Sequence, residues 1–230
     1  MSFFPLPNEM LWAVMLLLNF FTIILLYRTL GKVGLYVWIP ISVILANIQV
    51  LKTVELFGLT ATLGNIVYAS SFLVTDILSE NYGKEEAKRA VWIGFFAIIV
   101  MTVMMNLALY FSPADSDFAQ SHLEAIFSMM PRIAFASLTA YLLSQIHDIW
   151  AYDFWKRRFP SNRYIWLRNN ASTMISQLID SIVFVCVAFW GEFEMNILIE
   201  ILLTTYFMKW IVAIADTPFI YMAKNIFQKQ

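Results

Sequence analysis

Long apolar stretches alternate with short polar segments along the whole chain. Seven of them run over about 9–27, 33–51, 60–78, 90–111, 131–152, 171–190 and 197–222. A helix rises 1.5 Å per residue, so about 20 residues cross the roughly 30 Å hydrocarbon core of a bilayer. Each stretch approaches or exceeds that length, although the fifth and seventh carry more polar residues. The pattern predicts an all-α, polytopic bundle of membrane helices.

The composition supports a membrane protein. Apolar residues make up 60% of the 230 positions and charged residues 13%, against roughly 45–50% and about 25% in soluble domains. Lipid covers helix exteriors that a soluble fold of this size would have to bury. Because the loops are short, we expect a single integral membrane domain over residues 1–230. The first apolar run ends at Tyr27-Arg28 without a small-residue cleavage site, so we expect a retained helix.

The basic residues predict the orientation, because cytoplasmic loops of membrane proteins are enriched in Lys and Arg. If the N-terminus is outside and the C-terminus is in the cytoplasm, twelve of the fifteen basic residues lie on the inner side. These are Arg28, Lys32, Lys84, Lys88, Arg89, Lys156, Arg157, Arg158, Arg163, Arg168, Lys224 and Lys229. The longest outer loop, at 112–130, is expected to form a short interfacial helix.

Several chemistries have no sequence support. The net charge of −1 gives no electrostatic reason to bind nucleic acid. The chain has no Walker A motif, no H-E-x-x-H and no G-x-S-x-G. Cys186 is the single cysteine and is expected to be a small buried side chain, and His122 and His147 lie far apart. We therefore expect no enzymatic activity, no cofactor and no metal site.

Polar residues at membrane depth are the informative ones, because a charge at a helix centre costs about 2.5–3.5 kcal/mol on insertion scales. Asp180 lies about ten residues into the sixth stretch, with Gln177 and Thr173 on the same helical stripe. This stripe is either an interhelical hydrogen-bonding face or a solute site. Lys209 lies centrally in the seventh stretch, where it either pairs with Asp180 or Asp216 or takes part in transport, and the two roles are compatible.

Other stretches carry further polar candidates. Glu80 and Asp148 have an alternative interpretation as ordinary solvated acids near inner helix ends. Taken together, carboxylates, amides, a lysine and aromatic rings on several helices suit a small, polar, planar or zwitterionic solute. The additional candidates are Asn47, Asp76, Glu80, Arg132, Gln145, Asp148 and Tyr206.

Motifs in the third to seventh stretches resemble one known family. The segment LVTDILSENYG at 73–83 is followed by basic residues at 84, 88 and 89. The order continues with Arg132-Ile133-Ala134, Ala136-Ser137, Ala140-Tyr141, Gln145, Asp148, Asn170-Ala171-Ser172-Thr173, Gln177, Asp180, Tyr206, Lys209 and Pro218. In this order and spacing the chain resembles the queuosine precursor transporters, also described as vitamin-uptake-like transporters, over roughly residues 33–225.

The resemblance implies a six-helix transporter core over about 33–225, similar in shape to the substrate-binding subunits of energy-coupling-factor importers, in a prokaryotic inner membrane. The first helix, at about 9–27, would be an N-terminal addition. The family imports 7-deazaguanine precursors of queuosine. Its polar positions fall here on Asn47, Asp76, Arg132, Gln145, Asp148, Gln177, Asp180 and Lys209.

The residue chemistry is compatible with such a solute. A carboxylate such as Asp180 or Asp76 can accept from the amide N–H and amino group of a deazaguanine, while Gln177, Asn47 or Lys209 donates to its carbonyl. Tyr68, Tyr206 or Trp210 would stack on the ring. Two alternatives stay open: a binding subunit energised by a separate ATP-hydrolysing module, and a transporter for another small nucleobase or vitamin-like solute. The sequence also leaves a homo-oligomer open.

Overall fold

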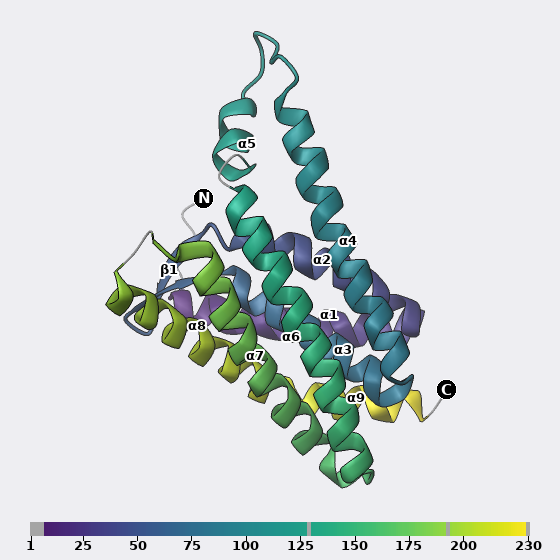
Figure 1. The fold of residues 1–230 in the computed structure, drawn as a ribbon. Helices are drawn as coiled ribbons and strands as arrows, with labels where there is room; N and C mark the ends of the chain where they lie inside the picture. Colours follow the sequence, from purple (N-terminus) through teal and green to yellow (C-terminus); the bar gives the residue numbers. More distant parts are fainter. Residues whose placement is uncertain (1–6, 128–129, 192–193, 229–230) are drawn as a thin grey trace.

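The computed structural model describes residues 7–127, 130–191 and 194–228, and they form a helical bundle with one short hairpin (Figure 1). The helices are α1 (Asn8–Leu30), α2 (Lys32–Gln49), α3 (Gly64–Asn81), α4 (Lys84–Leu109), α5 (Gln120–Phe127), α6 (Met130–Arg158), α7 (Ile165–Phe189), α8 (Met195–Ala215) and α9 (Thr217–Phe227). The strands are β1 (Thr53–Leu56) and β2 (Leu59–Thr62), and a 3-10 turn covers Asn162–Tyr164.

The predicted polytopic helical bundle is confirmed. In the described ranges, four helical segments are long and apolar enough to cross a membrane: α1, α2, α4 and the segment 162–189. A fifth is added if α5 and α6, which meet at a bend of 48°, count as one broken span. The other two predicted spans correspond to α3 and α8, which are helical but outside that set, so the total of seven spans stays a prediction.

Two predicted boundaries are wrong. The seventh stretch, expected to be one helix over 197–222, is divided between α8 and α9 at Asp216. Pro218 lacks a backbone N–H and is best accommodated in the first turn of a helix, so it starts α9 instead of continuing α8. The third stretch begins at Gly64 instead of residue 60, because 59–62 pairs with 53–56 in an antiparallel hairpin.

The hairpin turn has a simple backbone explanation. Phe57 and Gly58 occupy its two central positions with φ of 54° and 77°. Positive φ at both positions is the geometry of a two-residue type I′ turn, which matches the twist of paired strands. The hairpin connects the end of α2 to the start of α3. It therefore sets where α2 stops and α3 begins, close to the candidate site.

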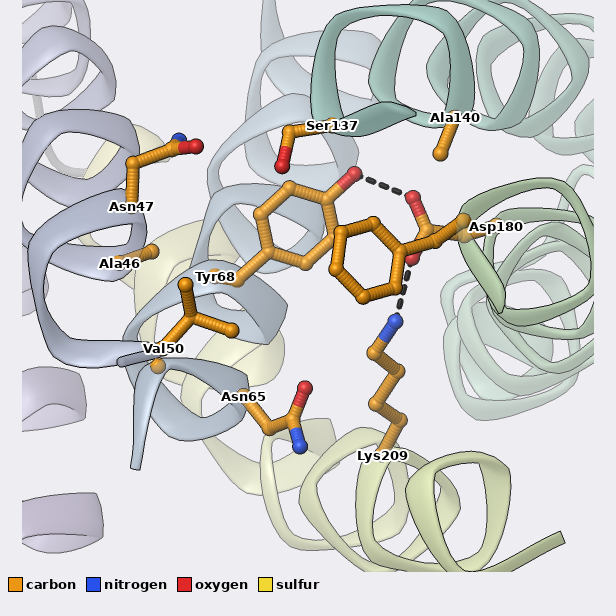
Figure 2. A pocket seen from close by; sticks show the side chains of 11 residues that line it. Ala46, Asn47, Val50, Asn65, Tyr68, Ser137, Ala140, Asp180 and Lys209 are labelled. Carbon is orange, nitrogen blue, oxygen red and sulfur yellow. Dashed lines mark hydrogen bonds and ion pairs between the residues drawn. The ribbon is translucent and has the colours of Figure 1, made fainter. Parts of the chain in front are cut away.

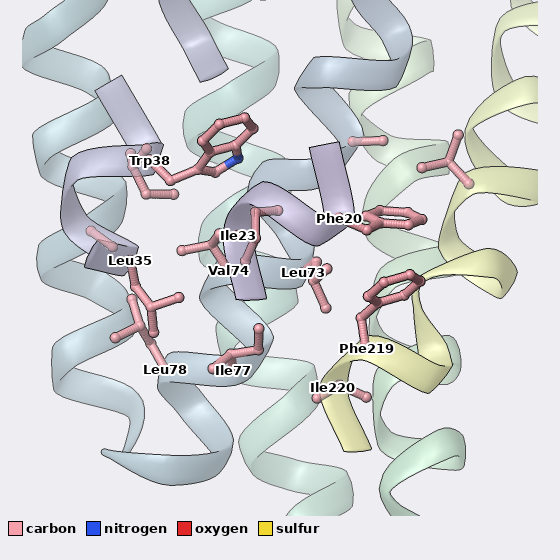
Figure 3. Close-up of a cluster of buried hydrophobic side chains, with 14 of the residues drawn as sticks. Phe20, Ile23, Leu35, Trp38, Leu73, Val74, Ile77, Leu78, Phe219 and Ile220 are labelled. Atoms are coloured by element: carbon pink, nitrogen blue, oxygen red, sulfur yellow. The ribbon is translucent and has the colours of Figure 1, made fainter. Parts of the chain in front are cut away.

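Helix α3 forms the centre of the bundle. Every residue from Ala69 to Glu80 is buried, and α3 contacts α1, α2, α4, α6, α7, α8 and α9. Figure 3 shows Leu73 and Ile77 of α3 close to Ile23 of α1, with Phe20 of α1 facing Phe219 of α9. Helix α1 is therefore packed into the shared core.

The hairpin of α4 and α6 extends beyond the other helices, and α5 lies near its tip (Figure 1). The helix expected within 112–130 is confirmed as α5; its position at the membrane interface stays a prediction. Cys186 is exposed on α7, so its predicted burial is wrong. The buried face of α7 is the polar one at Thr173, Gln177 and Asp180, which leaves apolar positions such as Cys186 to face outward.

Candidate functional site

A cavity of about 50 Å³ lies where α2 ends, α3 begins and α6, α7 and α8 pass (Figure 2). Since a buried water needs about 10–15 Å³ of such space, the cavity has room for roughly three to five waters. Its wall is half polar in residue type. The lining residues are Ala46, Asn47, Val50, Gly64, Asn65, Tyr68, Ser137, Ala140, Asp180, Phe184 and Lys209.

A buried ion pair dominates the cavity. Lys209 of α8 pairs with one carboxylate oxygen of Asp180 on α7, and each side chain is only 3% exposed. The other Asp180 oxygen accepts hydrogen bonds from the Tyr68 hydroxyl and from Ser144 Oγ, the latter at 3.2 Å. The Lys209 Nζ also lies 5.2 Å from the centre of the Tyr68 ring. Of the two partners considered for Lys209, Asp180 is therefore the one it contacts.

Local sequence explains why these groups converge. Thr173, Gln177 and Asp180 recur at three- and four-residue spacing, so they occupy the buried face of α7. On α6, the small side chains of Ala140 and Ser144 face the same region and leave space that a larger residue would fill. Small residues at four-residue spacing also let membrane helices approach closely, and α6 and α7 form the most extensive helix contact of the bundle.

The structure brings four predicted site residues to the cavity: Asn47, Tyr68, Asp180 and Lys209. Figure 2 shows Asn47 and Asp180 on opposite sides with the Tyr68 ring between them. The Asn47 Nδ2 donates to its own helix, at Val43 O, 2.8 Å away. Tyr68 was one of three aromatic residues considered for stacking on a solute, and its hydroxyl bond to Asp180 is an additional contact that spacing alone did not predict.

Four other predicted residues lie deeper in the bundle. Asp76, Gln145, Asp148 and Gln177 are all fully buried, but none lines the cavity. Gln145 bridges two helices, because its Nε2 donates to Ser71 Oγ at 3.0 Å and its Oε1 accepts from Thr75 Oγ1 at 3.1 Å. Both groups of the Gln145 amide therefore bond to side chains of α3. This residue thus serves as an interhelical hydrogen-bonding group.

Arg132, Tyr206 and Trp210 are placed elsewhere. Arg132 is exposed and donates to the carbonyls of Val187 and Trp190, which ties the start of α6 to the end of α7. Tyr206 is half-buried one turn before Lys209 and does not line the cavity. Trp210 is 37% exposed. Their roles in solute binding stay predictions.

Sequence reasoning missed three residues of this region as site candidates: Ser137, Phe184 and Ser144. Ser137 and Phe184 line the cavity, and Ser144 donates to Asp180. Ser137 and Ser144 are seven residues apart on α6, two turns on one face, a spacing that marks them as neighbours. Phe184 follows Asp180 by four residues on α7, and an aromatic residue there carries no signal that separates it from lipid-facing phenylalanines.

Comparison with known proteins gives consistent matches. The family described as "Putative vitamin uptake transporter" matches residues 62–223. A "Probable queuosine precursor transporter" of Bacillus subtilis (strain 168) is 44% identical over 219 residues, covering 95% of this chain and 96% of the relative. The "Queuosine precursor transporter" of Escherichia coli (strain K12) is 27% identical over 172 residues, covering 74% and 75%. No solved structure matches significantly.

Proposed function

The chain belongs to the vitamin uptake transporter family, and from this premise we propose that it imports queuosine precursors, which are 7-deazaguanine derivatives, across the cytoplasmic membrane. The observation that carries the proposal is the buried Asp180–Lys209 pair in the wall of a cavity that is otherwise largely apolar. It provides an acceptor and a donor side by side, as a deazaguanine edge requires. The relatives named as queuosine precursor transporters support this choice of solute.

Solute binding would replace contacts that the side chains now make with each other. Asp180 accepts hydrogen bonds from Tyr68 and Lys209. The amide N–H and amino group of a deazaguanine would take over as donors to this carboxylate, and the released Lys209 would donate to the adjacent carbonyl. Tyr68 would stack on the bicyclic ring, with the amide of Asn47 at the opposite wall (Figure 2). A space for a few waters is smaller than such a ring, so binding must widen the cavity.

The position of the cavity fits entry from outside. It is lined by the last turn of α2, the first of α3 and an early part of α6, represented by Asn47, Gly64 and Ser137. The predicted orientation, with the N-terminus outside and the C-terminus in the cytoplasm, puts these helix ends at the outer surface. The basic clusters at the opposite ends, such as Lys156 to Arg158, favour that orientation.

A cellular uptake assay tests this function. A bacterial host that cannot make queuosine and lacks its own transporter would express the chain and receive 7-cyano-7-deazaguanine at nanomolar concentration. Wild-type protein is expected to restore queuosine in tRNA. Asp180→Asn is expected to abolish it, because the amide has one acceptor oxygen where the carboxylate has two and cannot accept both donors of the solute. Asp115→Asn, an exposed outer-loop acid, is the matched control and should transport normally.

Two outcomes contradict parts of the proposal. Normal uptake by Asp180→Asn would remove Asp180 from solute binding. Unmodified tRNA despite wild-type protein in the membrane would point to another solute or to a separate energising module. Supplying other solutes, or co-expressing a candidate module, distinguishes the two explanations.

A further inference from the structure

Three carboxylates from three parts of the chain gather on the inner side of the cavity. Asp76 lies on α3, Asp148 on α6 and Asp216 between α8 and α9, and none is more than 1% exposed. Asp76 interacts electrostatically with both other acids, and Asp216 interacts with Asp148. Asp76 lies eight residues beyond Tyr68, so this carboxylate cluster is about 12 Å further along α3 than the cavity wall.

The carboxylate cluster has no cation of its own. None of the ion pairs among the described residues includes Asp76, Asp148 or Asp216. Burying three like charges together in a low-dielectric interior costs more than leaving protons on the acids. The neighbouring charged and titratable groups are Glu80 on α3, His147 and Tyr152 on α6, Arg168 on α7 and Lys209 on α8, and each has another partner.

An independent observation concerns Gln177, which is fully buried with no hydrogen-bond partner for either side-chain atom. It lies on α7 one turn from Thr173, whose Oγ1 donates to Asp76 Oδ2 at 3.0 Å, and one turn from Asp180. The amide therefore occupies the stripe between the cavity and the carboxylate cluster. A buried polar group left unpaired costs about 1–3 kcal/mol, and such groups in native structures call for a functional explanation.

Asp148 is the least satisfied member of the carboxylate cluster. Its carboxyl lies close to Asp76 and to the hydroxyls of Ser172, Thr173 and Ser176, yet neither oxygen makes a well-formed hydrogen bond. Asp76 and Asp216 each keep one oxygen bonded, to Thr173 and to Asn169 at 2.7 Å. A proton would find both oxygens of Asp148 available as acceptors.

The geometry selects the kind of ion. Within 7–127, 130–191 and 194–228, no three side chains of His, Cys, Asp or Glu are placed to share a metal ion. A metal needs several ligands that converge on one point, whereas a proton needs one oxygen at a time and can pass between neighbouring acids. Three buried acids that do not share one point therefore suit protons, which a single oxygen can hold.

We propose that the carboxylate cluster of Asp76, Asp148 and Asp216, approached past Gln177, is a proton-binding site that couples solute import to the proton gradient, with Asp148 as the principal carrier. The proposal rests on the proposed function. A proton enters from outside through the cavity, is held by the cluster while the solute occupies the Asp180 region, and leaves to the cytoplasm with the solute. Solute binding at Asp180 and proton binding at the carboxylate cluster are thus separate sites, and Gln177 of α7 lies between them.

Purified protein in liposomes separates coupling from binding. The probe is radiolabelled 7-cyano-7-deazaguanine. One assay measures its exchange with unlabelled solute across the liposome membrane without a pH gradient, and the other measures its net uptake when the outside is acidic. A one-unit pH gradient supports about tenfold accumulation at one proton per solute, since each 1.4 kcal/mol is a factor of ten. We expect wild-type protein to exchange and accumulate, and Asp148→Asn to exchange at the wild-type rate without accumulating. Asp153→Asn on the same helix, whose acid pairs with Lys84 and Arg157, should do both.

Each outcome has a defined meaning. Wild-type exchange without response to the pH gradient, or with a response to a Na⁺ gradient instead, overturns the proton site and leaves the proposed function intact. Full accumulation by Asp148→Asn overturns it as well. Absence of exchange by the wild type refutes the proposed solute instead. If Asp148→Asn is lost from the membrane, Asp216→Asn replaces it in the same two assays.

Discussion

Lys209 and Asp180 carry opposite charges at a depth where each side chain is only 3% exposed. Removing two charges from water costs several kcal/mol per ion, so the attraction between them largely offsets a penalty already incurred. If Lys209 is removed, Asp180 keeps its hydrogen bonds from Tyr68 and Ser144 but loses its counter-charge. This asymmetry lets the structural contribution of the pair be measured apart from its contribution to transport.

Lys209→Met is expected to lower the free energy of unfolding by about 3–5 kcal/mol, because Asp180 is left as an unpaired buried charge. The double variant Asp180→Asn with Lys209→Met should recover most of that loss while still failing to import the precursor. Thermal unfolding in detergent, followed by size-exclusion chromatography, measures the first effect, and the cellular assay measures the second. A double variant as unstable as the single one would show that the pair is not coupled energetically.

At the scale of elements, one buried acid holds four helices together at the predicted inner end. Glu80 of α3 lies 3.2 Å from Arg168 of α7, 3.1 Å from Lys224 of α9 and 3.9 Å from Lys156 of α6. The Tyr152 hydroxyl donates to the same carboxylate at 3.1 Å. Sequence reasoning favoured a solvated acid at Glu80; the structure instead buries it, with 4% exposure, because basic residues from three helices converge on it.

Glu80→Gln should therefore destabilise the protein strongly. It leaves three cations facing one another without a counter-charge, one of them the fully buried Arg168, and loss of one partner of a buried pair costs about 3–5 kcal/mol. The control is Glu85→Gln, whose exposed pair with Lys88 belongs to a class worth about 0–1 kcal/mol. Equal melting temperatures for the two variants would contradict the role of Glu80 as the inner anchor.

At the scale of the whole molecule, α1 belongs to the packed bundle. It contacts α2, α3 and α9, and the ring of Phe20 lies 4.8 Å from that of Phe219. The resemblance implied an N-terminal addition to a six-helix core, and that domain division stays a prediction. The packing indicates that α1 covers part of the surface of α3 that would otherwise face lipid or partners.

Phe20→Ala tests this packing. The lost burial of the ring and the cavity it leaves should together cost about 3–5 kcal/mol. Leu18→Ala removes a side chain that is 61% exposed on the same helix and should change the melting temperature little. If both variants melt like the wild type, α1 is not a structural part of the core.

The sequence by itself determined the helical membrane class, the order of the helices and the polar stripe of α7, because these depend on local periodicity and on the cost of polar groups in lipid. It also determined the family, whose motifs keep their order along the chain. It did not determine that Lys209 pairs with Asp180, that Asp148 joins Asp76 and Asp216, or that Arg132 lies outside the cavity. Only the tertiary structure decided these, because helices distant in sequence must cross before their side chains can meet.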